Sequence, residues 1–372
     1  MEPTFFKTGG GAAKRTRRGP SHRGRNQVII ACVVIAALAV GLWVVLHDSD
    51  RPAQRLAGET TSPAGPSNPP AGNGNTNTPP IGSQPPSEEQ VAREGHVPTN
   101  PTPPQQVTGD TQRELTDKLA QAESLFAQKK LLEARALFNQ IVDQGLGAEQ
   151  NARCVARLTE LADQTIFSFR HIPDDPTTAL FKVPPLGVFD KIAKTHKVRA
   201  VLLQEINGIP DAKRLRAGQT IKVVNGPFNA VVDKSDFTLS VYLDVPDGEG
   251  RPATPLLVRR YGVGLGEFNL TPTGVWKVVD IAHNPPYNHP RTNEEIAPNS
   301  PEYPFAPLGL WIRLEGIYGK ATGQIGYGIH STNEPESIGK QASLGCIRVG
   351  DEGIQMLVKL LRIEDSRVTI RE

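Results

Sequence analysis

Apolar residues follow four different patterns along the chain, and each pattern predicts a different kind of structure. Residues 28–46 form one unbroken apolar run, VIIACVVIAALAVGLWVVL. Residues 51–110 contain few large apolar side chains. From residue 111 apolar positions recur at three- and four-residue steps, which indicates helices. From about residue 228 they fall into short runs broken by Pro and Gly, which indicates strands.

The apolar run of residues 28–46 is predicted to be a single-pass transmembrane helix. It has the length that a bilayer requires, roughly 20 residues, whereas the core of a signal peptide has only about 7–15. The run ends in His-Asp-Ser-Asp without a small-x-small cleavage site. Residues 1–27 are rich in Lys and Arg, and we interpret them as a basic cytoplasmic tail, with everything after residue 46 outside the cytoplasm. A long cleaved signal peptide is the alternative.

Residues 51–110 are predicted to be a disordered, Pro-rich linker. Stretches such as PAGPSNPPAGNGNTNTPP cannot bury enough apolar surface to fold. A tether of this kind would let a membrane-bound domain work at a distance from the membrane.

Residues 111–168 show the periodicity of a helical region. The stretch AESLFAQKKLLEARALFNQIV resembles a single tetratricopeptide-type helix pair, with Lys129 and Lys130 at the break, and a further helix is expected over residues 148–167. The alternative interpretation is a helical hairpin that packs against the next domain.

Residues 179–225 predict a small β-α-α-β module. A strand at Leu180–Val183 and two helices lead to a strand at Thr220–Val224, and the second helix stops at Asn207-Gly208. The segments LLQEING and LRAGQTIKV, at this spacing, resemble a LysM module, which implies peptidoglycan binding. The first loop, PPLGVF, departs from the usual Gly-Asp-Thr-Leu type of turn, so glycan binding and a purely structural role both remain open.

Residues 228–372 predict a mainly-β domain with one flanking helix, for which Asp351 is the expected N-cap. The fold class is therefore multidomain: a transmembrane helix, a helical hairpin region, a LysM-like module and a mainly-β domain. The net charge of +2 and the lack of a basic stripe argue against a nucleic-acid partner.

The three cysteines of the chain have different surroundings in the sequence. Cys32 lies in the apolar run, and Cys154 lies on the apolar face of a predicted helix, where it acts as a small buried hydrophobe. Cys346 then has no partner for a disulfide, and a free thiol outside the cytoplasm points to chemistry rather than structure.

Candidate catalytic chemistry surrounds Cys346. His330 ends a strand-like run 16 residues earlier, and a nearby imidazolium would lower the pKa of the thiol well below its ordinary value. The amides of residues 345–346 could bind an oxyanion at Gly345. Arg348 shares a face with Cys346 if the segment is extended, and Ser343 adds a hydroxyl.

The motifs His330-Ser331-Thr332 and Ser343-Leu344-Gly345-Cys346-Ile347-Arg348 resemble the signature HGT…SxGC[IV]R of the L,D-transpeptidase catalytic domain (YkuD-like). LTPTGVWKV at residues 270–278 is similar to another stretch of that family. Ser331 stands where the family usually has glycine, and Leu344 where histidine is frequent. The resemblance implies that Cys346 and His330 are catalytic, while the oxyanion and the substrate are bound by Gly345, Arg348, Ser343, Ser331 and Thr332.

The resemblance also implies an enzyme that remodels bacterial peptidoglycan through a cysteine thioester and forms 3→3 cross-links between stem peptides. It implies no metal and no cofactor. Partners would be donor and acceptor stem peptides, glycan strands through the LysM-like module, and the membrane through residues 28–46. The alternatives are an inactive peptidoglycan-binding scaffold and an L,D-carboxypeptidase or protein-anchoring variant. A papain-like protease is excluded because its cysteine precedes its histidine.

Overall fold

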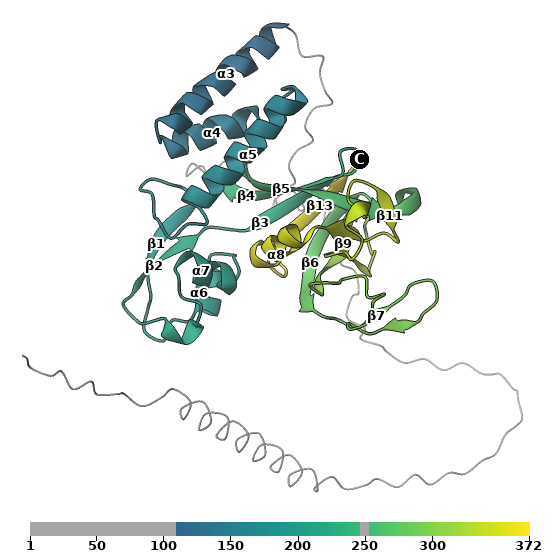
Figure 1. Cartoon of the computed structure of the whole chain (residues 1–372). Helices are drawn as coiled ribbons and strands as arrows, with labels where there is room; N and C mark the ends of the chain where they lie inside the picture. Colours follow the sequence, from purple (N-terminus) through teal and green to yellow (C-terminus); the bar gives the residue numbers. More distant parts are fainter. Residues whose placement is uncertain (1–108, 246–252) are drawn as a thin grey trace, which may run out of the picture. The chain divides into compact units, whose positions relative to one another are not determined.

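The computed structural model describes residues 109–245 and 253–372, which fall within one compact unit (Figure 1). The predicted cytoplasmic tail, transmembrane helix and linker lie outside the described residues. Within the described part of the chain, no helix combines the length and the apolar character needed to cross a bilayer.

Three helices open the described chain: α3 (Gly109–Ala127), α4 (Leu131–Ile141) and α5 (Ala148–Thr165). The break between α3 and α4 falls at Lys129 and Lys130, as predicted, and Lys129 turns the chain with φ of 61°. α4 packs against both α3 and α5 because each helix buries one apolar stripe. Cys154 is fully buried on that stripe of α5, which confirms its predicted role.

The predicted β-α-α-β order is present. Strand β1 (Thr178–Lys182) pairs antiparallel with β2 (Thr220–Val224), and helices α6 (Phe189–Thr195) and α7 (Ala200–Ile206) lie between them in the chain. α7 stops at Asn207, whose side-chain amide donates hydrogen bonds to the carbonyls of Leu203 and Lys222. The assignment of this module to the LysM class stays a prediction.

A buried lysine joins this module to the helices. Lys222 is only 2% exposed, and its ammonium donates to three backbone carbonyls at and just beyond the end of α5: Thr165 at 2.5 Å, Ser168 at 2.9 Å and Arg170 at 2.8 Å. A cation at the carboxyl end of a helix satisfies carbonyls that have no partner within the helix. Burial lowers the pKa of Lys222 to about 8.

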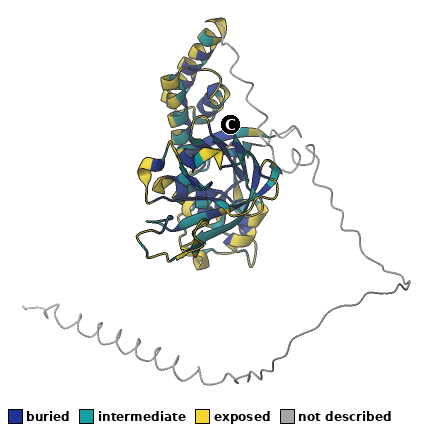
Figure 2. Cartoon of the chain, turned by 90° about the vertical axis from the view of Figure 1, so that its right-hand side faces the viewer, coloured by how far each residue is buried: buried dark blue, intermediate teal, exposed yellow. Residues whose placement is uncertain are grey.

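The rest of the chain forms a mixed sheet in the order β11-β5-β12-β10-β9-β6-β13-β3-β4, and β4 also pairs with β5. The strands are β3 (Phe228–Asp233), β4 (Thr238–Val245), β5 (Thr254–Gly266), β6 (Gly274–His283), β9 (Leu310–Gly319), β10 (Tyr327–His330), β11 (Gln341–Ser343), β12 (Ile347–Val349) and β13 (Arg367–Arg371). A small separate hairpin, β7 (Tyr287–Asn288) and β8 (Glu295–Ile296), lies between β6 and β9. Buried residues concentrate in the sheet, and exposed residues follow the helices and loops (Figure 2).

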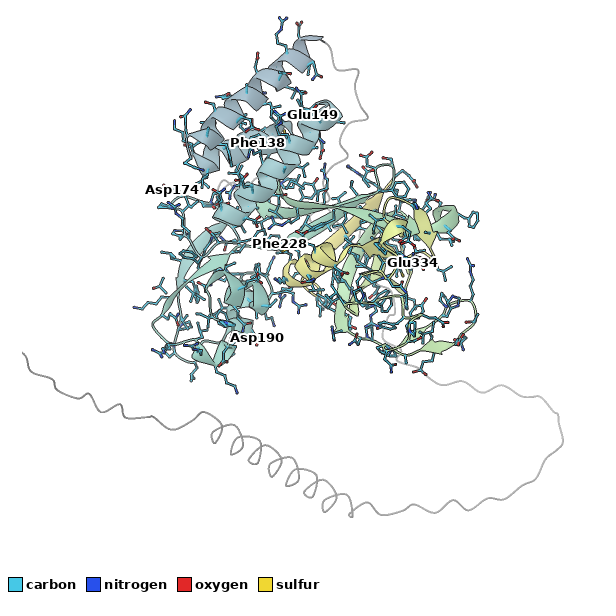
Figure 3. All side chains as sticks on the ribbon, in the orientation of Figure 1. Phe138, Glu149, Asp174, Asp190, Phe228 and Glu334 are labelled. Carbon is cyan, nitrogen blue, oxygen red and sulfur yellow. The ribbon has the colours of Figure 1, made fainter. Side chains whose placement is uncertain are left out.

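The helices pack against the sheet. The Asn139 side chain bonds the backbone of Pro255 and Leu257 at the start of β5, at 2.9 and 3.0 Å. Phe228, at the start of β3, stacks on Phe167 with 6.1 Å between ring centroids (Figure 3). The helical region thus packs on the sheet domain, and its assignment as a tetratricopeptide-type pair or a helical hairpin stays a prediction.

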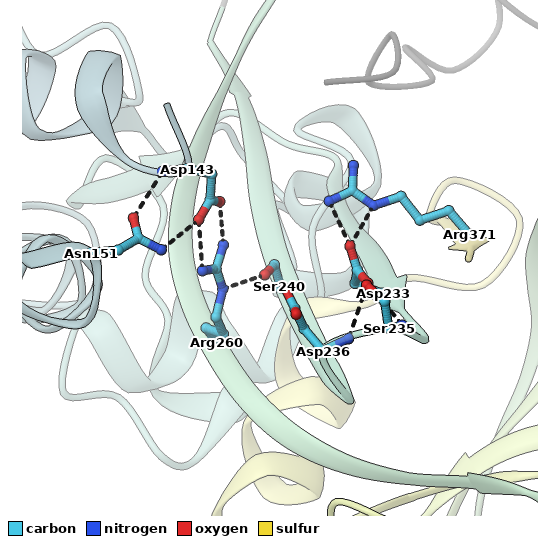
Figure 4. A network of polar contacts seen from close by, with 8 residues as sticks. All are labelled: Asp143, Asn151, Asp233, Ser235, Asp236, Ser240, Arg260 and Arg371. Carbon is cyan, nitrogen blue, oxygen red and sulfur yellow. Dashed lines mark hydrogen bonds and ion pairs between the residues drawn. The ribbon is translucent and has the colours of Figure 1, made fainter. Parts of the chain in front are cut away.

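A polar network reinforces the same contact (Figure 4). The guanidinium of Arg260, on β5, donates to both carboxylate oxygens of Asp143, at 3.0 and 2.5 Å, and to the hydroxyl of Ser240 on β4. Asn151 of α5 holds Asp143 from the other side. Burial alone would raise the pKa of Asp143, but hydrogen bonding and charge from Arg260 outweigh it and leave that pKa below its ordinary value.

The one α-helix among the described residues of the sheet domain, α8 (Asp351–Leu360), begins one residue before the predicted start. Its N-cap, however, is Gly350 and not Asp351. Asp351 occupies the first turn, where its negative charge still stabilises the helix through the macrodipole. The role expected for Asp351 was wrong by one position, since glycine is also tolerated as an N-cap.

Candidate active site

The pairing of β10 with β12 places the predicted site residues together. The two strands are parallel, and His330 lies opposite Arg348. Side chains two residues apart on a strand share a face. Cys346 therefore lies beside Gly328, on the same face as His330 and Arg348.

Gly328 is needed at this position. A Cβ on residue 328 would lie 2.6 Å from both the Trp311 ring and the Ile312 carbonyl, so no side chain fits there. The Cys346 thiol donates to the Gly326 carbonyl at 3.9 Å, and the backbone of Gly328 lowers the pKa of the thiol. The backbone of β10, which carries no side chain at residue 328, thus packs directly against the thiol.

The imidazole of His330 is buried and oriented by the main chain. Its Nδ1 lies 2.5 Å from the carbonyl oxygen of Ser331. A carbonyl only accepts hydrogen bonds, so Nδ1 carries the proton and Nε2 is left as a proton acceptor.

Two aromatic rings enclose this imidazole. The Phe305 ring centroid lies 4.7 Å from that of His330, and Trp311 stacks on it at 5.6 Å with an angle of 26° between the planes. Burial disfavours the imidazolium and lowers the pKa of His330 to about 4, with the positive charge of Arg348 acting in the same direction.

The thiol of Cys346 is also neutral at rest. Burial raises its pKa to about 11, while the Gly328 amide and the charge of Arg348 act in the opposite direction without overcoming it. The expectation of a lowered thiol pKa was wrong. It assumed a charged imidazole beside the sulfur, and the packing around His330 keeps that ring uncharged.

Ser343 holds the turn that carries Cys346. Its hydroxyl donates to the Cys346 carbonyl at 2.6 Å and accepts from the Gly345 amide at 3.2 Å. The Gly345 amide is therefore engaged in this structure, and the Cys346 amide is the other member of the predicted oxyanion pair. Gly345 has φ of 125°, and a Cβ there would lie 2.8 Å from the Tyr327 ring.

Ser331 and Thr332 are both buried and bind neighbouring backbone. The Ser331 hydroxyl donates to the Phe305 carbonyl at 2.5 Å, which ties the segment between β6 and β9 to the residue that follows His330. The Thr332 hydroxyl accepts the amide of Glu334 at 3.0 Å. The structure thus gives both side chains a positioning contact.

Arg348 forms an ion pair that the sequence did not predict. One guanidinium nitrogen, Nη1, lies 2.6 Å from Oε2 of Glu334. The Arg348 side chain is 13% exposed and that of Glu334 is 51% exposed.

Comparison with known proteins identifies the domain that carries these residues. Residues 227–370 match the family model of the L,D-transpeptidase catalytic domain, YkuD. Residues 227–370 are therefore similar to YkuD-type L,D-transpeptidase catalytic domains. The match begins one residue before β3 and ends within β13, so it spans the sheet together with α8.

Three similar proteins give the extent of the likeness. YqjB of Bacillus subtilis, provisionally named an L,D-transpeptidase, is 35% identical over 113 residues, 30% of this chain and 58% of its own length. YkuD of Bacillus licheniformis, also provisionally named so, is 26% identical over 201 residues, 51% of this chain and 98% of its own length. An L,D-transpeptidase structure from Mycobacterium smegmatis is 16% identical with a TM-score of 0.28, covering 42% of this chain and 64% of that one.

Several residues around the candidate site were not anticipated as members of it. The Thr271 hydroxyl donates to the Gly345 carbonyl and accepts the Gly266 amide, each at 2.9 Å. Thr271 belongs to the LTPTG stretch, so its motif was a usable signal. Phe305, Trp311 and Glu334 had no comparable signal, because each reaches the site through tertiary contacts. Within residues 109–245 and 253–372, no cluster of three His, Cys, Asp or Glu side chains suits a metal ion.

Proposed function

We propose that this protein is a membrane-anchored L,D-transpeptidase that cross-links peptidoglycan stem peptides through a thioester on Cys346. The observation that carries the proposal is the shared face of β10 and β12. Cys346, His330 and Arg348 meet there, and His330 is held in the tautomer that leaves Nε2 free to accept a proton.

Acylation would start from the neutral pair. The Cys346 sulfur attacks the carbonyl of the third stem residue while its proton moves to Nε2 of His330. The carbonyl oxygen becomes an oxyanion, which the Cys346 amide is placed to stabilise. The carbon–nitrogen bond to the terminal D-alanine then breaks, and His330 returns the proton to the departing amine.

The thioester would next transfer its acyl group to an amine. The side-chain amine of a second stem attacks the thioester carbonyl, His330 takes the amine proton, and the proton returns to the sulfur as the carbon–sulfur bond breaks. A 3→3 amide cross-link and a free thiol result. Attack by water or by an amine of another protein would give the carboxypeptidase or protein-anchoring variant with the same residues.

Residues outside the catalytic domain would set the place of action. Residues 28–46 would anchor the chain, with the N-terminus in the cytoplasm and the catalytic domain outside it, and residues 51–110 would act as the tether. The β-α-α-β module would bind glycan strands, as its LysM-like pattern suggests.

The test is detection of the acyl-enzyme. The full-length protein is incubated with a carbapenem, which acylates reactive active-site nucleophiles, and with disaccharide-tetrapeptide, and intact mass and muropeptide products are recorded. We expect one adduct per chain and cross-linked products in the wild type, and neither in Cys346→Ser. An unmodified wild type would favour the alternative function, an inactive peptidoglycan-binding scaffold.

A further inference from the structure

Arg348 is a cation on the face shared by Cys346 and His330, and it forms an ion pair with Glu334. The contact is single: Nη1 bonds Oε2 at 2.6 Å. A guanidinium carries five N–H donors in a fork that matches a carboxylate with two parallel bonds. Arg348 thus has donors left over, and its only ion-pair partner within the described residues is Glu334.

Hydrogen bonds hold the backbone of Glu334, whereas its side chain is half exposed. The Thr332 hydroxyl accepts its amide at 3.0 Å. Its carbonyl accepts from the Ser337 hydroxyl at 2.6 Å and from the Ser337 amide at 3.0 Å. The Glu334 carboxylate is half exposed, and Arg348 is its one ion-pair partner among the described residues, so it can rotate into water at little cost.

We infer that Glu334 is a specificity-determining residue, an internal carboxylate that holds Arg348 in the free protein and is displaced by the terminal carboxylate of the acyl-donor peptide. The inference rests on the proposed function. The terminal carboxylate lies one residue beyond the bond that Cys346 attacks. Arg348 is two residues after Cys346 on the same face of the extended chain, so their Cα atoms are about 7 Å apart. A peptide seated on the thiol therefore brings its carboxylate within reach of the long Arg348 side chain.

The displacement lets Glu334 discriminate between ligands by the charge of their C-terminus. A ligand with a free terminal carboxylate recovers the ion pair that it breaks and gains the second bond of the fork. A ligand whose terminus is an amide cannot replace the lost charge. Competition from a half-exposed carboxylate is modest, worth about a two- to fivefold change in affinity.

The experiment compares two peptides on three proteins. The peptides are the stem tetrapeptide ending in D-alanine and the same peptide with a C-terminal carboxamide. The proteins are full-length Cys346→Ser, which binds without turnover, and the same protein with Glu334→Gln or Glu336→Gln added. Glu336 is the matched control, an exposed acid on the same loop. Dissociation constants are measured by calorimetry at fixed salt.

We expect Glu334→Gln to bind the acid peptide about two- to fivefold more tightly, with the amide peptide unaffected, and Glu336→Gln to change neither. Equal or weaker binding of the acid peptide by Glu334→Gln, an equal gain for both peptides, or no binding by any protein would overturn the inference. The same peptides incubated with proteins that retain Cys346 test the chemistry separately. Binding as expected without an acyl-enzyme would overturn the proposed function alone.

Discussion

At the scale of the residue, the neutral state of both Cys346 and His330 is the feature with the largest chemical consequence. Burial raises the pKa of Cys346 to about 11 and lowers that of His330 to about 4, so both side chains are predominantly uncharged near neutral pH. Oxidation of a cysteine depends on its thiolate, so the neutral thiol of Cys346 resists it.

Alkylation of Cys346 tests this state. We expect the rate with iodoacetamide to be low at pH 7 and to rise toward pH 11 as the thiolate forms. His330→Ala should keep this alkaline midpoint, because the histidine it removes was uncharged, yet slow carbapenem acylation by about 10²- to 10⁴-fold. Peptide mapping assigns each cysteine, and buried Cys154, whose pKa burial also raises to about 11, is the internal control. A midpoint below about 8.5 in the wild type would restore the thiolate–imidazolium pair.

Acylation should also depend on the protonation of His330 itself. A pKa lowered to about 4 means that the base is available at neutral pH and is lost only as the pH falls through about 4. The acid limb of the pH–rate profile for carbapenem acylation is the measurement, with the protein confirmed to be folded over that range. An acid limb near pH 6.5 would show that the imidazole is far less buried than the contacts with Phe305 and Trp311 indicate.

Ser331 offers a third test at this scale. Its hydroxyl connects the residue after His330 to the Phe305 carbonyl, and Phe305 covers the imidazole. Losing one such hydrogen bond is worth about 0.5–1.5 kcal/mol, so Ser331→Ala should slow acylation by about two- to tenfold. Ser331→Gly, which restores the residue usual in the family, should be at least as slow here. A Ser331→Ala rate equal to wild type would mean that the bond does not position the ring.

At the scale of the element, the contact between the helices and β5 combines apolar packing with a charged pair. Asp143 follows α4 and Arg260 lies on β5, so the pair joins segments 117 residues apart in the chain. Lys222 makes a similar connection between β2 and the end of α5. A chain truncated between these elements would leave polar groups without hydrogen-bond partners. For buried groups this lowers the free energy of unfolding.

The pair of Asp143 and Arg260 is accessible to measurement. We expect Asp143→Asn to lower the free energy of unfolding by about 1 kcal/mol at pH 7 in urea, with Arg260→Gln non-additive in a double-mutant cycle. Because the folded-state pKa of Asp143 is lowered, this contribution is present above the ordinary value of 3.8 and is lost as the pH falls below it. The exposed pair Glu114–Lys118 on α3 is the control, and Glu114→Gln should have a much smaller effect. Equal effects at the two sites would mean that the contact adds no stability.

At the scale of the whole molecule, the β-α-α-β module has a pocket of its own. The pocket of about 480 Å³ is lined by Gly208, Ile209, Arg214, Arg216, Ala217 and Gln219, in the connection between α7 and β2. Deleting the module is a poor test of its role, because Lys222 would leave the carbonyls beyond α5 unpaired. Substitution at the pocket leaves that connection intact.

We expect Arg216→Ala to reduce pull-down of the full-length protein on isolated sacculi several-fold while the rate on soluble disaccharide-tetrapeptide stays unchanged. The physical reason is that the module would bind the polymer and not the reacting bond. Lys191→Ala, at an exposed lysine of α6, is the charge-matched control. Unchanged sacculus binding in Arg216→Ala would favour the purely structural role of the module.

Local patterns in the sequence determined much of this protein. Helical periodicity placed α5 within two residues of its observed end, and the strand Thr220–Val224 was predicted at its observed bounds. The short motifs around His330 and Cys346 indicated the domain family, because the residues that build the turn and the strand ends are close together in the chain. These features depend on backbone preferences and spacing, which act over a few residues.

Only the tertiary structure decided the electrostatics and the connections of the site. The pKa values of Cys346 and His330 depend on burial by Phe305 and Trp311, which come from other segments. The partner of Arg348 is an acid on a loop, and the partner of Ser331 is a carbonyl 26 residues away. No local pattern encodes such contacts, because the free energy of a charge is set by everything that folding brings around it.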